Sequence, residues 1–134
     1  MTRTVQALIA CLIAGNATAS ENVETVAAIL ASAPCSPRAT SVVAYLQAGR
    51  HGAWLSDTVG SHRSIGIDFA AHGGGRDIEA VRRYVWRPQD YLRSTFRAKF
   101  HGALSCPPDG ANAPALRIDR VEEITISRIA DANP

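Results

Sequence analysis

Apolar and polar residues alternate most clearly in residues 51–69, HGAWLSDTVGSHRSIGIDF. At its end, Ile65–Phe69 alternates large apolar side chains with Gly66 and an aspartate, the pattern of a half-buried strand. Trp54 and Leu55 mark an earlier strand, and the intervening SDTVGSHRS is rich in residues that favour turns. The segment therefore predicts two strands joined by a polar turn, with Gly66 at a bulge or a close backbone approach.

Three further segments have strand-like patterns: Ser41–Gln47, Ser94–Cys106 and Ala115–Ile126. The second is the longest, and its apolar face alternates with a basic one. The third changes phase near Arg120, which predicts a β-bulge there. Leu116 and Ile118 are in phase before that change, and Val121, Ile124 and Ile126 follow on a shifted phase.

Helical spacing of apolar residues predicts two helices. The first covers Glu21–Ala33, with Asn22 as its N-cap and prolines at its end. The second covers Asp77–Trp86, begins at an Asp77 cap, and is limited by a proline. We expect Gln89–Arg93 to be an irregular approach to the next strand.

Three strands, a helix and two strands follow the element order of an OB-fold, a five-stranded Greek-key barrel. We therefore expect a mainly β fold, with a short leading helix and a second helix between strands three and four. In this topology the first strand runs antiparallel beside the fourth. The length of 134 residues fits one domain, which we place at residues 20–134.

The N-terminus has the anatomy of a secretory signal peptide. Met1–Gln6 carries a basic residue, Ala7–Gly15 is an uninterrupted apolar run, and an A-x-A site predicts cleavage after Ala19. The apolar run is too short to span a bilayer. Two alternatives remain: a lipoprotein signal with Cys11 as the lipidated residue, and a buried N-terminal helix. The first interpretation places the mature protein in the periplasm or outside the cell.

Cleavage would remove one of the three cysteines and leave Cys35 and Cys106. An even number of cysteines in an exported chain favours a disulfide bond. The expected barrel also brings the start of the first strand, near Cys35, close to the end of the fourth, at Cys106. The alternative is a pair of buried free thiols.

Composition and charge narrow the functional classes. A hydrophobic content of 46% is too high for a disordered chain. The formal net charge is +2 with a pI near 8.6, and Lys99 is the only lysine. Dedicated nucleic-acid-binding domains more often have clustered basic residues and a pI above about 9. The charge balance therefore disfavours nucleic acid as the partner.

Residues from Thr25 to Ile126 resemble a group of small exported bacterial proteins of unassigned function with an OB-like barrel. The matching motifs are a leading helix, a first strand, a G-x-H-G-x-x-L-x-D hairpin, a G-I-x-L strand and a late F-x-G-x-L strand. They correspond here to Thr25–Leu30, Val42–Tyr45, Gly49–Asp57, Gly66–Phe69 and Phe100–Leu104. A cysteine often follows the hairpin aspartate in these proteins, but Val59 and Gly60 stand there in this chain. The resemblance implies a fold and export, and transfers no catalytic residue.

OB-folds commonly bind oligonucleotides or sugars through aromatic and basic side chains. The candidates here are one aromatic residue in the hairpin and a basic stripe expected to face solvent. These candidate binding residues are Trp54, Arg97, Lys99, His101 and Arg117. Because aromatic residues do not interleave with the stripe, an ordinary solvated surface is the simpler interpretation.

The metal and catalytic motifs are weak. His51, Asp57 and His62 could meet at the hairpin, but the tight ligand pairs typical of zinc sites are absent from the sequence. His72–Gly75, HGGG, is similar to an oxyanion-hole loop, yet the chain has no G-x-S-x-G nucleophile. No phosphate-loop lysine follows these glycines. We therefore expect no catalytic residues, no metal and no cofactor.

The sequence favours an exported, non-catalytic OB-like domain that binds an envelope protein or a small ligand, or has a structural role. The first alternative is a domain that binds oligonucleotides or other polyanions. The second is a small hydrolase using histidines and Asp57. The sequence does not identify the ligand or the oligomeric state.

Overall fold

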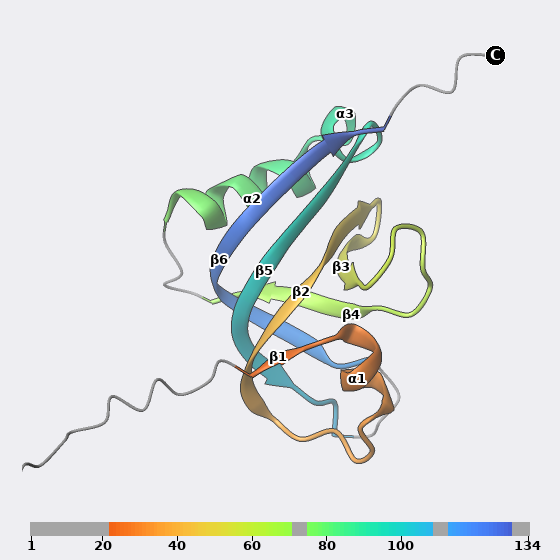
Figure 1. Cartoon of the computed structure of the whole chain (residues 1–134), viewed down its shortest axis with the longest axis vertical. Coiled ribbons are helices and arrows are strands. Elements are labelled where there is room, and N and C mark those ends of the chain that lie inside the picture. Colours follow the sequence, from red (N-terminus) through yellow and green to blue (C-terminus); the bar gives the residue numbers. More distant parts are fainter. Residues whose placement is uncertain (1–21, 71–74, 109–112, 130–134) are drawn as a thin grey trace, which may run out of the picture.

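The computed structural model describes residues 22–70, 75–108 and 113–129. In these residues six strands form one sheet (Figure 1): β1 (Val23–Glu24), β2 (Arg38–Gly49), β3 (Gly52–Ser56), β4 (Ile65–Phe69), β5 (Ser94–Ser105) and β6 (Ala115–Arg128). The helices of the described residues are α1 (Val26–Ala31), α2 (Arg76–Trp86) and α3 (Pro88–Tyr91). The predicted mainly β class is confirmed.

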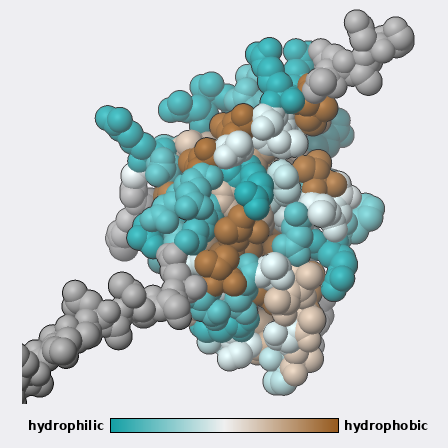
Figure 2. Space-filling model, in the orientation of Figure 1, coloured by the Kyte–Doolittle hydropathy of each residue, from teal (hydrophilic) through white to brown (hydrophobic). Residues whose placement is uncertain are grey.

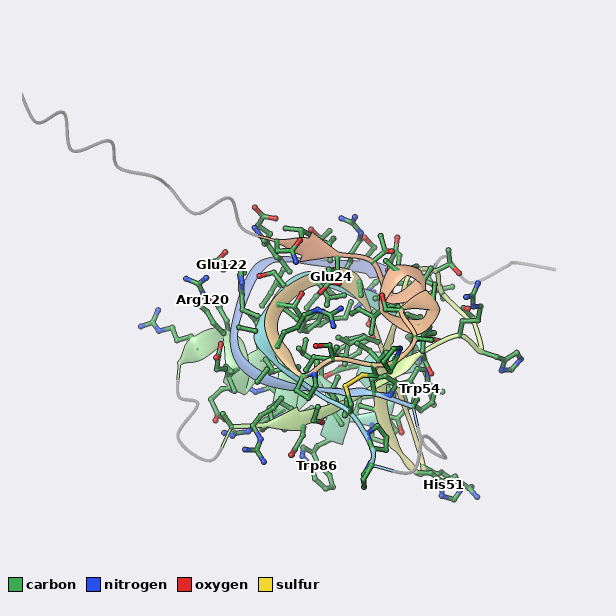
Figure 3. The ribbon with its side chains drawn as sticks, turned by 90° about the horizontal axis from the view of Figure 1, so that it is seen from below. Glu24, His51, Trp54, Trp86, Arg120 and Glu122 are labelled. Carbon is green, nitrogen blue, oxygen red and sulfur yellow. A yellow bond between two sulfur atoms is a disulfide. The ribbon has the colours of Figure 1, made fainter. Side chains whose placement is uncertain are left out.

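The sheet curves into a partial ring, visible from below in Figure 3, with the strand order β1-β2-β3-β4-β6-β5. β2 also pairs with β5, antiparallel, from Arg38 opposite Leu104 to Leu46 opposite Phe96. The predicted antiparallel contact between these two strands is confirmed. β4 and β6 are parallel, as are β1 and β2. The predicted count of five strands was wrong, because the two-residue β1 adds to the edge of β2.

The first helix is shorter than predicted. It covers Val26–Ala31, because the residues before it pair with β2 as a strand. Its N-cap is Thr25 rather than Asn22, and the Thr25 hydroxyl accepts a hydrogen bond from the Ala28 N–H at 3.0 Å. Asn22 instead uses its backbone carbonyl, which accepts from the Ser41 N–H. The residues that the sequence pattern assigned to the first turn of this helix, Val23 and Glu24, thus form the strand β1 instead.

The region after β4 also differs from the prediction. α2 begins at Arg76 after Gly75, and no side chain caps it, so Asp77 lies in its first turn rather than at its N-cap. Pro88–Tyr91 forms the short helix α3, where an irregular segment was expected, because proline is well suited to the first turn of a helix. Figure 1 shows α2 and α3 at one end of the sheet and α1 at the other.

The predicted hairpin is present. β3 and β4 are antiparallel, with Trp54 opposite Gly66 and Leu55 opposite Ile65. No shift of register occurs at Gly66 within this pairing. The close approach is instead at Gly102 of β5, where an added Cβ would lie 1.9 Å from the Arg117 carbonyl oxygen.

β6 is bulged, as its change of phase indicated. The pairing of β5 with β6 shifts register between His101 and Gly102, which skips Asp119, next to the predicted position. A second shift lies near Glu123, whose φ is 55°. Beyond these two shifts of register, Ile126 is 56% exposed.

The core fills the inside of the curved sheet and is closed by one face of each longer helix. Phe96 and Phe100 of β5 are fully buried, and the Phe96 ring lies 4.9 Å from that of Tyr84 on α2. The other large, fully buried side chains are Val26, Ile29, Val42, Leu55, Ile65, Ile78, Val81, Leu104, Leu116 and Ile118. Burial of so many aliphatic side chains is the main source of stability in this fold.

A disulfide bond joins Cys35, just before β2, to Cys106, just after β5, with a Cα–Cα distance of 5.8 Å. The predicted bond is therefore confirmed and ties together two strands that also pair. No helix in the described ranges has the length and apolar character needed to cross a bilayer. The predicted signal peptide, residues 1–19 with Cys11, lies outside the described residues.

Candidate functional site

The predicted aromatic candidate, Trp54, lies half-buried on β3, between its partners on β2 and β4 (Figure 3). Its ring covers Gly49 at the other end of the β2–β3 turn, where an added Cβ would lie 3.2 Å from Trp54 Cη2. The six-membered ring of the indole thus packs against the backbone at the end of β2. Trp54 thus has a structural contact that the sequence pattern did not indicate.

Two residues of the predicted basic stripe are exposed but have neighbours. The Arg97 guanidinium lies over the Tyr45 ring, 6.0 Å from its centroid. The Arg117 side chain faces Asp68 of the neighbouring strand β4, with Nε 3.7 Å from Oδ2. Both guanidinium groups therefore already interact with a side chain of a neighbouring strand.

His101 does not face solvent as expected, because its side chain is only 8% exposed. Ser41 Oγ lies 2.6 Å from Nδ1, and Glu122 Oε2 lies 3.1 Å from Nε2. Arg120 Nη2 is 3.4 Å from Nδ1, and Lys99 is paired in register with Glu122. The basic stripe is thus interrupted by a buried histidine and an acidic residue.

Serine, histidine and glutamate in a row are the residue types of a nucleophilic triad, which needs a serine hydroxyl that a substrate can reach. Ser41 is only 5% exposed and lies within β2, with its own N–H bonded to the Asn22 carbonyl. An imidazole with its proton on Nε2 donates to Glu122 and accepts from Ser41, which satisfies all three groups. The row therefore ties strands together, and a substrate has no access to the Ser41 hydroxyl.

The three metal candidates are spread over the hairpin. His51 is exposed in the turn between β2 and β3 and points away from the ring in Figure 3, and His62 is exposed in the β3–β4 connection. Asp57 lies against the N-terminus of α1, where Oδ1 accepts from the Val26 N–H and Oδ2 from the Ala27 N–H, each at 2.8 Å. Among the residues described, no group of three or more His, Cys, Asp or Glu side chains is arranged to hold a metal.

A cavity of about 620 Å³ lies between α2, α3 and the ends of β5 and β6. We call it the arginine pocket. Its charged and polar lining residues are Arg83, Gln89, Asp90, Arg93, Ser94 and Arg128. Its apolar lining residues are Ala80, Tyr84, Ile126 and Ile129. In Figure 2, hydrophobic atoms stand among hydrophilic ones at the end of the molecule where β6 terminates.

The local folding of each element explains why these side chains meet. Arg83 lies on α2 one turn after Ala80, and both flank the side of the helix that buries Tyr84. Arg93 follows Leu92, the C-cap of α3, and the Arg93 carbonyl accepts from the Ile129 N–H at 2.9 Å. Arg128 is paired with Ser94 at the end of the β5–β6 ladder. Three arginines distant in sequence therefore converge.

The pocket carries uncompensated positive charge. Within the described part of the chain, Arg83, Arg93 and Arg128 form no ion pair with a carboxylate. Asp90 contributes one negative charge, which leaves the lining with a net excess of two positive charges. Like charges in a concave site raise the local concentration of anions. The pocket is thus suited to an anion.

Tyr84 holds together the elements that form one wall of the pocket, through its hydrogen bond to Ser94. Burial is the main effect that raises the pKa of the Tyr84 phenol, and the nearby Asp90 carboxylate adds to it. The phenol therefore stays protonated and donates to the Ser94 carbonyl at 2.8 Å. Ser94 Oγ in turn donates to the Asp90 carbonyl, which fastens α3 to the start of β5.

This pocket was not predicted, although Arg83 and Arg93 are visible in the sequence as basic residues near a proline. The sequence does not show that the end of β6 brings Arg128 and Ile129 to the helices. Comparison of the chain with protein-family models, with curated proteins and with solved structures gave no match.

Proposed function

We propose that the fold is an OB-like barrel with one added edge strand. The pairings β2–β3, β3–β4, β4–β6, β6–β5 and β5–β2 support this, because they lead through five strands and return to the first. The parallel pairing of β4 with β6, and the position of α2 between β4 and β5, fit a Greek-key barrel of this kind.

We further propose that the protein is exported. The basic, apolar and small-residue segments of residues 1–19 support a signal peptide, and the disulfide is compatible with a periplasmic or extracellular location. The intact mass of the protein from its native host is the direct test. We expect a chain that begins at Ser20, is lighter by two hydrogen atoms and does not react with alkylating reagent. A full-length mass with free thiols would overturn the proposal.

The function we propose is non-catalytic binding of an anionic ligand in the arginine pocket. The carrying observation is the convergence of Arg83, Arg93 and Arg128 without a carboxylate partner in the described residues. Arginine suits this role because its planar guanidinium binds carboxylate, phosphate or sulfate through two parallel hydrogen bonds. A volume of about 620 Å³ is in the usual range for a small-ligand site.

The alternatives have less support. A polyanion would need an extended basic surface, whereas Arg117 faces Asp68 and Lys99 is paired in register with Glu122. A hydrolase using histidines and Asp57 would need these groups together, whereas His51 and His62 lie in different connections and Asp57 binds the N–H groups at the start of α1. The arginine pocket, in contrast, combines concavity with excess charge.

Calorimetric titration with inorganic pyrophosphate at low ionic strength tests the proposal. The pocket variant is Arg83→Gln/Arg93→Gln/Arg128→Gln, and the matched control is Arg63→Gln/Arg76→Gln/Arg97→Gln, which removes the same charge elsewhere. We expect the pocket variant to bind at least about tenfold more weakly than the control, because each charge-assisted hydrogen bond contributes about 1.5–3 kcal/mol. Equal weakening in both variants would show that only overall charge matters and would contradict the proposal.

A further inference from the structure

We infer that the ligand of the arginine pocket is an amphiphilic anion, with one compact charged head and an aliphatic chain. This inference rests on the proposed function and deepens it. It separates the pocket from sites for fully polar anions such as sugar phosphates or oligonucleotides. The observations that carry it are the apolar share of the lining and a second cavity beside the first.

The pocket has a charged side and an apolar side. Ile126 and Ile129 are 56% and 50% exposed, although isoleucine is among the residues most often buried. Both line the pocket, together with Ala80 of α2. An inorganic anion would contact the arginines and leave this apolar surface in water. A ligand with an aliphatic part covers it, which is the more favourable arrangement.

A smaller cavity of about 100 Å³ continues from the pocket toward the sheet. The two cavities share Tyr84, Ser94 and Ile129 as lining residues. The smaller one adds polar and apolar groups in about equal measure, and its apolar groups include Val59 and the half-buried Tyr91. Val59 is 54% exposed, so some apolar surface lies beyond the arginines and gives room for the end of a chain.

The charged residues of the pocket lining indicate which anionic head group the ligand carries. Asp90 lies in the lining beside three arginines, so the pocket neutralises about two negative charges. A sulfate or phosphate head accepts from two guanidinium groups at once. The ester oxygen of such a head can accept a hydrogen bond from the Gln89 side-chain amide, which lines the same cavity. A single terminal head with an apolar chain fits this distribution.

The test is a chain-length series of linear alkyl sulfates from butyl to decyl, each below its critical micelle concentration, measured by calorimetry on the full chain. We expect affinity to rise about three- to fourfold for each added methylene until the apolar surface is covered. In the Ile126→Ser/Ile129→Ser variant this rise should flatten, while butyl sulfate binds as before. The matched control is Val23→Ser/Leu92→Ser, since both residues are exposed and lie outside the pocket lining.

The outcomes separate the two proposals. If butyl sulfate and pyrophosphate bind as well as decyl sulfate, the amphiphile inference is overturned and the anion site stands. If no anion binds, the proposed function itself fails. If the rise with chain length persists equally in the isoleucine variant and in its control, the chains associate elsewhere on the surface, and the inference is likewise overturned.

Discussion

The carboxylate of Asp57, at the end of β3, holds the N-terminus of α1 by accepting the Val26 and Ala27 N–H groups at 2.8 Å. A negative charge at this end of a helix is favourable, because it meets unpaired N–H donors and the positive end of the helix dipole. We expect Asp57→Ala to lower the free energy of unfolding by about 1–2 kcal/mol. Urea denaturation measures the change.

The matched control for that variant is Asp119→Asn, at an exposed position of β6. It should change the free energy of unfolding by less than about 0.5 kcal/mol. Equal effects of the two substitutions would mean that Asp57 does not stabilise the helix.

Glu24 predicts a pH dependence of stability. Hydrogen bonds from Arg38 and Thr40 hold the pKa of Glu24 below its ordinary value of 4.5, against the opposing effect of burial. A carboxyl with a lower pKa in the folded state stabilises the fold above the unfolded-state pKa and loses this effect as pH falls. Glu24→Gln should therefore cost about 1 kcal/mol at pH 7 and progressively less below about pH 4.5.

Chemical denaturation of the native protein and of Glu24→Gln between pH 7 and pH 3 measures this difference. Glu123→Gln is the control, because it removes a carboxylate of the same type from an exposed position of β6. A difference for Glu24 that stays constant over the whole range would contradict the ion-pair interpretation.

Gly102 gives the clearest steric prediction. A Cβ there would lie 1.9 Å from the Arg117 carbonyl oxygen, so the β5–β6 ladder must shift to accept any side chain. Gly102→Ala should lower stability by about 3 kcal/mol or more, as overpacking against backbone does. At Gly66 an added Cβ meets Ala115 Cβ at an ordinary 3.5 Å, so Gly66→Ala is the matched control. Thermal denaturation measures both variants, and an equal loss of stability in Gly102→Ala and Gly66→Ala would contradict the predicted steric clash at Gly102.

Among single residues, the sequence indicated which were polar but not which partners they had. His101 alternates with apolar neighbours in β5, which correctly places it on the opposite face from Phe100 and Gly102. Its burial depends on Ser41 and Glu122, which pairing brings together from two other strands. Such long-range register is not encoded in local alternation.

At the scale of elements, the disulfide joins the segment before β2 to the end of β5 and closes 71 residues of chain. A covalent link over a loop of this length restricts the unfolded chain and stabilises the fold by about 2–4 kcal/mol. Cys35→Ser/Cys106→Ser should lose about this amount in urea denaturation. Reductant should lower the stability of the native protein toward that of the variant and leave the variant unchanged. Insensitivity of the native protein to reductant would contradict this role.

Period-two alternation was sufficient to find β2, β4, β5 and β6, and helical spacing was sufficient to find α2, because each of these elements buries one face. The adjacent Trp54 and Leu55 marked β3. These patterns failed at β1 and α3, which are too short to show a period. The start of α1 could not be predicted either, since the Asp57 side chain that supports it comes from 30 residues later in the sequence. Element ends here depend on tertiary contacts more than on local propensity.

At the scale of the whole molecule, the antiparallel contact of β2 with β5 and the disulfide could both be predicted, because the order of elements restricts the arrangements available. The arginine pocket could not. It requires the end of β6, beyond the second shift of register near Glu123, to bring Arg128 to Arg83 and Arg93. A functional site assembled from three elements is visible only in the folded chain.

The measurement that most directly tests the central claim is a ¹H–¹⁵N NMR titration of the full chain with octyl sulfate below its critical micelle concentration. We expect the largest shift changes at the backbone amides of Ala80, Gln89, Arg93 and Ile129, which line the arginine pocket. The largest changes at Arg97, Lys99 and Arg117, or equal changes over the whole surface, would contradict an anion site between α2, α3 and the ends of β5 and β6.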